Sequence, residues 1–228
     1  MTRIFGSSAR VIAMLPALVL TGCSGVFESK LDAPQAYVLR LPPATTTAGE
    51  ATLGSVLVQR PEAGPGLGTD RIALVRSEGR FDYYAAARWA APTPDLVESA
   101  LVDALRATGS YSAVLDDAAP FAPRYDLRVT LRRFEADYSN GGGAEAAPTI
   151  HVVLDCTVGR RRDRQLLASF TAQGSTQAQA DRLNAVVAAF ESATAGAVAQ
   201  LLDATSSAIA ADPQAAAPAP IPATSESR

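Results

Sequence analysis

The chain has 228 residues, of which 48% are hydrophobic and 19% charged, and its formal net charge is −3 at pH 7. This length is enough for one domain with a substantial core. The acidic balance argues against nucleic acid as a partner, because phosphate binding depends on clustered lysine and arginine.

The first 22 residues have the pattern of a secretory signal peptide. Residues 1–10 carry two arginines and no acid, and residues 11–20 are wholly apolar. Ten helical residues reach about 15 Å, whereas a bilayer core is roughly 30 Å thick, so a membrane-spanning helix is not expected. We therefore predict that residues 1–22 are absent from the mature protein.

Residues 20–23, Leu-Thr-Gly-Cys, resemble the lipobox of bacterial lipoproteins. In that class the cysteine thiol is diacylated, the chain is cut before it, and the new amine is acylated. Two or more acyl chains give a stable membrane anchor, here predicted at Cys23. Ser24 follows in place of Asp, which by resemblance to the enteric sorting rule favours the periplasmic face of the outer membrane. Anchoring at the inner membrane stays open.

Residues 23–35 form a short polar tether, and the folded domain is expected at residues 36–207. Residues 208–228 are rich in Ala and Pro and lack a periodic apolar face, so we predict a disordered tail.

Four short strands are expected first, each ended by a turn or by proline. They are predicted at residues 36–41, 55–61, 71–77 and 80–85. The last two form a hairpin over Glu78 and Gly79. A helix follows, with Thr93 as its N-cap and Gly109 as its stop.

Residues 124–134 and 149–158 alternate apolar and polar side chains, as antiparallel strands with one buried face do. A third strand is predicted at 166–172 and a long helix at 183–206, whose interior Gly196 indicates a close helix-on-sheet contact. The fold predicted is a single α+β domain, a largely antiparallel sheet with two main helices packed on one face.

Candidates for chemistry are few. The single histidine, His151, falls on the polar face of a strand, and Cys156 falls on the buried face. No clustered metal ligands, no G-x-S-x-G elbow and no phosphate-binding loop occur in the sequence. We therefore predict no catalytic residues, no metal and no cofactor. If Cys23 is acylated, Cys156 has no disulfide partner in the chain.

Two stretches are candidates for binding. In residues 81–96, Tyr83, Tyr84, Arg88 and Trp89 either pack in the core or form a partner surface, because Arg, Tyr and Trp are common interface anchors. In residues 160–164, a basic cluster is either a solvated hairpin tip or a contact for phospholipid headgroups or an acidic partner. The residues of that cluster are Arg160, Arg161, Arg162 and Arg164.

The order of these blocks resembles the ABC-type transport auxiliary lipoproteins. The matching blocks are Cys23, the YVL strand at 37–39, residues 71–77, residues 81–101, the strand at 125–134 and the helix at 186–193. Ala90-Ala91 departs from the family, which has an acidic position after the Trp. The resemblance implies a non-enzymatic accessory of an ABC permease and ATPase complex with an MCE-domain protein. Such systems move phospholipid or other hydrophobic molecules between the inner and outer membranes.

Two other classes of function compete with this interpretation. One is an envelope assembly or structural lipoprotein that binds peptidoglycan or a cell-wall synthase. The other is a periplasmic hydrolase, which would have to use His151. The sequence leaves the oligomeric state open, and a homo-oligomer is one alternative.

Overall fold

The computed structural model describes residues 33–42, 52–139 and 146–215, all within one compact unit, Ala33–Arg228. The predicted signal peptide and Cys23 lie outside the described residues, as does the end of the predicted tail. The described elements are β1 (Gln35–Tyr37), β2 (Val56–Val58), β3 (Glu62–Ala63), β4 (Arg71–Val75), a 3₁₀ turn (Ser77–Gly79), β5 (Phe81–Trp89), α1 (Thr93–Ala107), β6 (Val114–Leu115), β7 (Tyr125–Asp137), β8 (Thr149–Arg160), β9 (Gln165–Gln177) and α2 (Leu183–Ala210).

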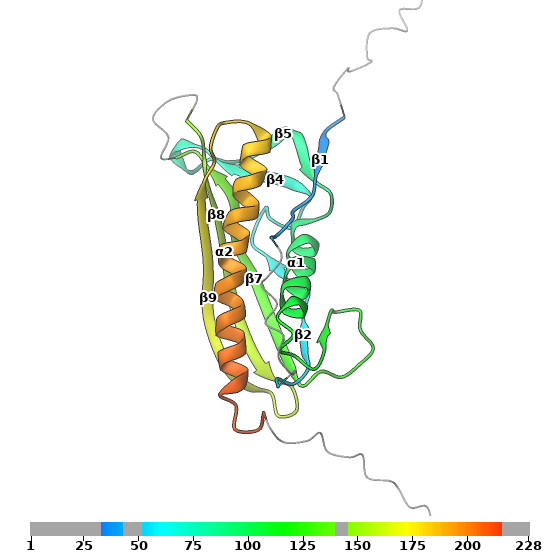
Figure 1. Ribbon diagram of the computed structural model, residues 1–228. Coiled ribbons are helices and arrows are strands. Elements are labelled where there is room, and N and C mark those ends of the chain that lie inside the picture. The colour runs from blue at the N-terminus through cyan, green and yellow to red at the C-terminus, as the bar shows by residue number, and fades with distance from the viewer. Residues whose placement is uncertain (1–32, 43–51, 140–145, 216–228) are drawn as a thin grey trace, which may run out of the picture. The chain divides into compact units, whose positions relative to one another are not determined.

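The nine strands within the described residues form one mixed sheet, curled into a half-barrel (Figure 1). Five strand pairs are parallel, and three are antiparallel: β4–β5, β7–β8 and β8–β9. The predicted largely antiparallel sheet was therefore wrong. Apolar alternation reports which face of a strand is buried, and it carries no information on the direction of the neighbouring strand.

Three of the five parallel pairs lie along one edge of β7. There β2, β3 and β4 follow one another, paired with Tyr125–Leu127, Thr130–Leu131 and Glu135–Asp137 in turn. The N-terminal part of the chain thus advances along β7 in the same direction as β7 itself. The other edge of β7 pairs with β8 over its whole length.

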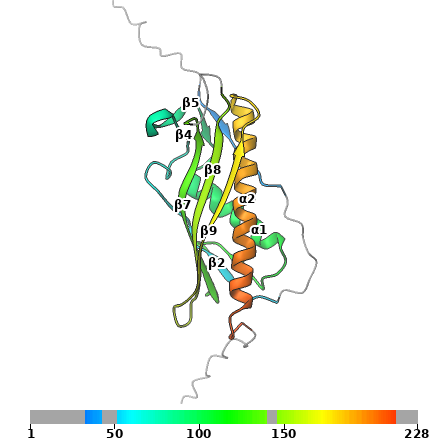
Figure 2. The same cartoon turned by 90° about the vertical axis from the view of Figure 1, so that its left-hand side faces the viewer.

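Both α-helices cover one face of the sheet, as predicted (Figure 2). The predicted alternation in β7 also holds, since Tyr125, Leu127 and Leu131 are fully buried. A bulge between Leu131 and Arg133 then shifts the register, which returns Phe134 to the core side. The predicted N-cap was wrong: Thr93 is the first residue of α1, and its hydroxyl donates to the carbonyl of Thr69 instead.

Helix α2 is long and apolar enough to cross a bilayer, but it is packed along β8 and β9 as a core helix. Its residues Phe190, Ala197 and Leu201 are fully buried. The helix ends at Ala210 rather than near residue 206, and Asp212 beyond it is buried. The expected boundary at residue 207 was therefore too early.

Candidate functional site: an arginine–tyrosine cleft

The β4–β5 hairpin shapes a cluster of cationic, aromatic and acidic side chains around a hollow. Its turn uses left-handed backbone at Glu78 and Gly79, with φ of 67° and 70°. The turn brings Arg76 and Arg80 to the same end of the hairpin, where the backbone N–H of Arg76 donates to the carbonyl of Arg80. Three elements, β4, β5 and the end of β7, meet there beside the segment before α2.

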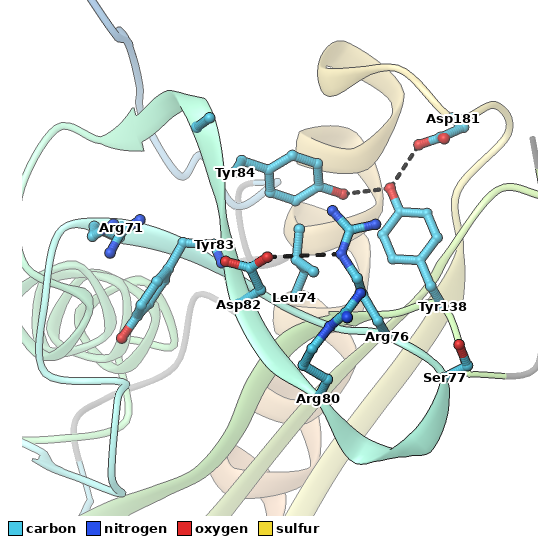
Figure 3. Close-up of a pocket in the computed structure, with 11 residues that line it drawn as sticks. Arg71, Leu74, Arg76, Ser77, Arg80, Asp82, Tyr83, Tyr84, Tyr138 and Asp181 are labelled. Carbon is cyan, nitrogen blue, oxygen red and sulfur yellow. Dashed lines mark hydrogen bonds and ion pairs between the residues drawn. The ribbon is translucent and has the colours of Figure 1, made fainter. Parts of the chain in front are cut away.

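These elements enclose a hollow of about 800 Å³, which we call the arginine–tyrosine cleft (Figure 3). Its lining combines cationic, aromatic and acidic side chains from segments far apart in the sequence. The lining residues are Arg71, Leu74, Arg76, Ser77, Arg80, Asp82, Tyr83, Tyr84, Ala85, Tyr138 and Asp181.

One side of the cleft is fixed by Tyr83. The guanidinium carbon of Arg71 lies 3.9 Å from the centre of the Tyr83 ring, within range of a cation–π contact. The Tyr83 hydroxyl donates to the carbonyl of Gly66 at 2.9 Å, and Phe81 packs edge-on against the ring. The ring is therefore held in place while it supports the arginine.

The other side holds a chain of hydrogen bonds. The hydroxyls of Tyr84 and Tyr138 lie 2.7 Å apart, and the Tyr138 hydroxyl donates to Asp181 at 2.6 Å. Burial raises the pKa of Tyr84 to about 12, and burial together with the Asp181 carboxylate raises the pKa of Tyr138. Both phenols therefore stay protonated at neutral pH. These two hydrogen bonds link β5 to the end of β7 and to the segment before α2.

The cleft carries cationic charge that its own carboxylates do not fully neutralise. Arg76 pairs with Asp82 at 3.7 Å, and Asp181 is engaged by Tyr138. Within the described residues, the exposed Arg80 side chain has no hydrogen-bond or ion-pair partner. Such an arrangement suits a carboxylate or other anionic group on a partner surface.

The cleft offers no catalytic constellation. No group of three His, Cys, Asp or Glu side chains that could hold a metal occurs in the described part of the chain. His151 lies on β8, outside the cleft lining, half-buried and 3.3 Å from the Ser175 hydroxyl. Burial and the nearby Arg133 lower the pKa of His151, so the ring is mostly neutral at pH 7.

The four partner-binding residues predicted on β5 do not form one surface in the structure. Tyr83 and Tyr84 line the cleft. Arg88 lies outside the lining, where its guanidinium pairs with Asp70 at 3.2 Å. Trp89 is only 1% exposed, with ring contacts to Phe134 and Phe190, so its proposed role as a surface anchor was wrong and its alternative role in packing is correct.

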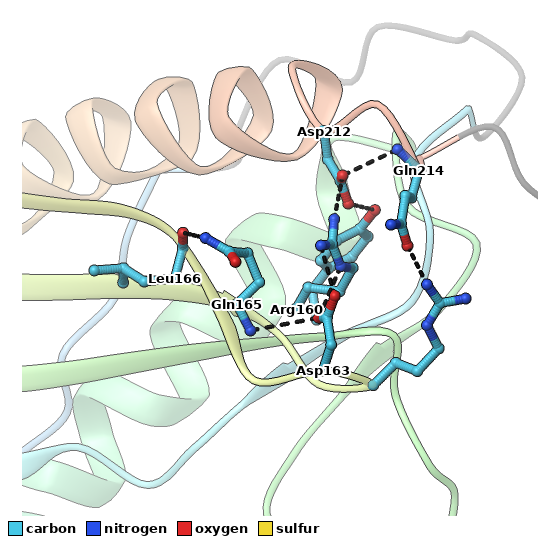
Figure 4. Close-up of polar contacts among 8 residues, drawn as sticks. Arg160, Asp163, Gln165, Leu166, Asp212 and Gln214 are labelled. Carbon is cyan, nitrogen blue, oxygen red and sulfur yellow. Dashed lines mark hydrogen bonds and ion pairs between the residues drawn. The ribbon is translucent and has the colours of Figure 1, made fainter.

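The arginines of the predicted basic cluster at the β8–β9 turn differ in exposure and in their partners (Figure 4). Arg160 turns inward, is 8% exposed, and binds Asp163 and Asp212. Its proposed surface contact was therefore wrong, because its guanidinium is already satisfied. Arg161 pairs with Asp126, whereas Arg162 donates to Gln214.

Sequence reasoning missed most of the arginine–tyrosine cleft. A local signal existed for Arg71, Arg76 and Arg80, which recur at both ends of the predicted hairpin. No local signal existed for Tyr138 and Asp181. The pairing of β4 with β7 brings Tyr138 to the hairpin, and Asp181, from the segment before α2, accepts its hydrogen bond there.

Comparison with known proteins assigns this geometry to a class. Residues 37–202 match the family described as ABC-type transport auxiliary lipoprotein component. A crystal structure of a Xanthomonas campestris protein from the family DUF330 is 26% identical, with a TM-score of 0.68 over 76% of this chain and 95% of that chain. A crystal structure of an uncharacterised protein is 14% identical, with a TM-score of 0.59 over 76% of this chain and 99% of that one. No curated protein matches the sequence.

The fold and the match define a lipid-anchored protein of the cell envelope with an auxiliary role in transport, a role that is typically non-catalytic. The chain belongs to the family of ABC-type transport auxiliary lipoprotein components, because the match spans nearly three quarters of its length. An ABC transporter is therefore the implied partner system.

Proposed function

We propose that this lipoprotein is the periplasmic docking component of an ABC system with an MCE-domain protein. The system would move phospholipid or another hydrophobic substrate between the inner and outer membranes. The transporter supplies ATP hydrolysis, and this chain supplies a fixed point of attachment.

The arginine–tyrosine cleft is the observation that carries the proposal. Arg and Tyr are enriched among residues that dominate binding energy at interfaces. Here their side chains are already held by hydrogen bonds and a cation–π contact, so little conformational entropy is lost on binding. Arg80, whose side chain has no ion-pair partner in the described part of the chain, adds an anchor for a partner carboxylate.

Acylation of Cys23 is the second part of the proposal. An acylated cysteine would hold the domain at a membrane, and Ser24 favours the outer membrane. Membrane fractionation of cells that express the chain, with and without Cys23→Ala, tests this. We expect wild type in the outer-membrane fraction and loss of acylation in the variant; acylated protein confined to the inner membrane would contradict the assignment.

The docking role is tested by co-purification of the lipoprotein with the MCE-domain protein of the same organism. Arg71→Glu and Arg80→Glu should each weaken binding about tenfold or more, because they reverse charge inside the cleft. Arg132→Glu is the matched control, since Arg132 is an exposed arginine on β7 outside the cleft.

Binding that survives both cleft variants would refute the proposed surface. Binding to purified cell-wall sacculi, without any MCE-domain partner, would favour the envelope assembly alternative instead. Light scattering on the purified protein decides whether it is a homo-oligomer, which stays a prediction.

A further inference from the structure

The β8–β9 turn lies at the opposite end of α2 from the β4–β5 hairpin (Figure 1). A second hollow lies beside this turn. Its volume is about 630 Å³, and we call it the arginine hollow. Its polar lining includes Gln59, Arg128, Thr157, Arg161, Arg164 and Gln165. At 1.5 Å per residue, the 28 residues of α2 separate the two sites by about 40 Å.

The arginine hollow has an excess of positive charge. Its one lining carboxylate, Asp126, is paired with Arg161 at 3.1 Å. The positive charge of the Arg160 guanidinium is neutralised by ion pairs with Asp163 and Asp212. Within the described residues, Arg128 and Arg164 have no side-chain hydrogen bond or ion pair, so two guanidinium groups face the hollow without an anion. Guanidinium pairs of this kind are typical of sites for phosphate groups.

The turn that carries these arginines is rigidly held. Arg160 bridges the turn to Asp212 in the segment after α2 (Figure 4). Asp212 also accepts a hydrogen bond from the buried Tyr125 hydroxyl. The backbone N–H of Arg161 donates to the carbonyl of Arg124. Arg164 adopts a left-handed φ of 57°, a conformation that a non-glycine residue keeps only when its surroundings impose it.

An apolar groove adjoins the arginine hollow. It has a volume of about 480 Å³ and lies between the start of β9 and the end of α2. Its apolar lining includes Leu166, Leu167, Phe170, Ala204, Ala208 and Pro213. Leu166 lines both the hollow and the groove, and its side chain is 55% exposed. A cationic site therefore continues into an apolar one across a single exposed leucine.

We propose that the arginine hollow and the apolar groove together bind one anionic amphiphile of the phospholipid type. Its phosphate lies between Arg128 and Arg164, and one hydrocarbon chain passes over Leu166 into the groove. Charge complementarity selects the phosphate, and apolar burial selects the chain. None of these residues lines the arginine–tyrosine cleft, so this inference does not depend on the docking role.

The test uses the chain from Ser24 onward, which keeps the whole compact unit and cannot be acylated. Calorimetry measures binding of dihexanoylphosphatidylglycerol below its micelle concentration, with glycerol phosphate as the headgroup probe. Arg128→Glu and Arg164→Glu should each weaken binding of the lipid and of glycerol phosphate about tenfold or more. Leu166→Asp should weaken lipid binding alone. Arg132→Glu, at an exposed position of β7 outside the hollow and the groove, should change neither.

The following results would overturn the proposal. Lipid binding that is absent in wild type, or unchanged by both arginine variants, removes the arginine hollow as the site. Glycerol phosphate that binds as tightly as the lipid, with no effect of Leu166→Asp, would make this a site for a free phosphate ester. Because Leu166, Arg128 and Arg164 are exposed, thermal melting should show that all three variants remain folded.

Discussion

Gly174 of β9 lies directly against Gly196 of α2: a Cβ built on Gly196 would meet the Cα of Gly174 at 3.8 Å. The close helix-on-sheet contact expected from an interior helical glycine is confirmed. The two glycines are not equivalent, however. A Cβ on Gly174 would lie 1.8 Å from the carbonyl oxygen of Ala193, which belongs to the backbone of α2 and cannot move aside by itself.

The glycine pair predicts opposite outcomes for the same substitution. Gly174→Ala should lower the free energy of unfolding by about 1–3 kcal/mol or more, because α2 must shift away from β9. Gly196→Ala should leave the free energy unchanged or raise it by up to about 1 kcal/mol, because alanine favours the helix and its methyl group fits. Urea denaturation followed by circular dichroism measures both. Equal destabilisation by the two variants would contradict this packing.

The buried Trp89 gives a second prediction, on stability. Trp89→Ala should cost about 3–5 kcal/mol of unfolding free energy, because the ring packs edge-on against both Phe134 and Phe190, which also contact each other. Trp89→Phe should cost much less, since the indole N–H is buried without a partner among the described residues and phenylalanine loses no hydrogen bond there.

Arg88→Ala is the adjacent control for Trp89. Its exposed ion pair with Asp70 should contribute no more than about 1 kcal/mol. Chemical denaturation compares the three variants. A Trp89→Ala protein as stable as Arg88→Ala would show that the indole is not part of the core.

Local patterns predicted the strands and helices well, because burial of one face leaves a period that can be read from neighbouring residues. The buried alternation of β7 and the apolar stripe of α2 are examples. Strand direction and site assembly depend on long-range pairing. The docking of β4 beside Glu135–Asp137 makes the sheet mixed, and it also brings Tyr138 to Tyr84. The residue pattern within any single strand or helix does not predict this contact between Tyr84 and Tyr138.

Cys156 provides a prediction on reactivity. Its side chain is 1% exposed, and burial raises the pKa of the thiol to about 12. At pH 8 only roughly one molecule in ten thousand would carry the reactive thiolate. In the chain from Ser24 onward, Cys156 is the one cysteine, and Ellman's reagent should not react until denaturant is added. An added Ser99→Cys on the exposed side of α1 should react at once; a fast native reaction of Cys156 itself would contradict its burial.

The hydrogen bonds and ion pairs around Asp212 should make the stability of the fold decrease at low pH. Burial alone would raise the pKa of Asp212, but the backbone N–H of Gln214, the Tyr125 hydroxyl and Arg160 outweigh it, so the net pKa is lowered. The hydrogen bond from Arg160 lowers the pKa of Asp163 to about 2. A carboxylate with a lowered pKa stabilises the fold above its ordinary pKa, near 4, and this contribution is lost as the pH falls through the folded-state value.

Thermal melting between pH 7 and pH 2 should therefore show a loss of stability that begins near pH 4. Asp212→Asn should melt several degrees below wild type at pH 7, because the Arg160 guanidinium then lacks one of its two carboxylates. The variant should also lose less stability than wild type between pH 4 and pH 2, since its residue 212 cannot be protonated in that range. Asp103→Asn, on an exposed position of α1 with no hydrogen bond or ion pair among the described residues, should melt like wild type at pH 7. If Asp212→Asn shows the full acid loss of wild type, the Asp212 carboxylate does not contribute to it.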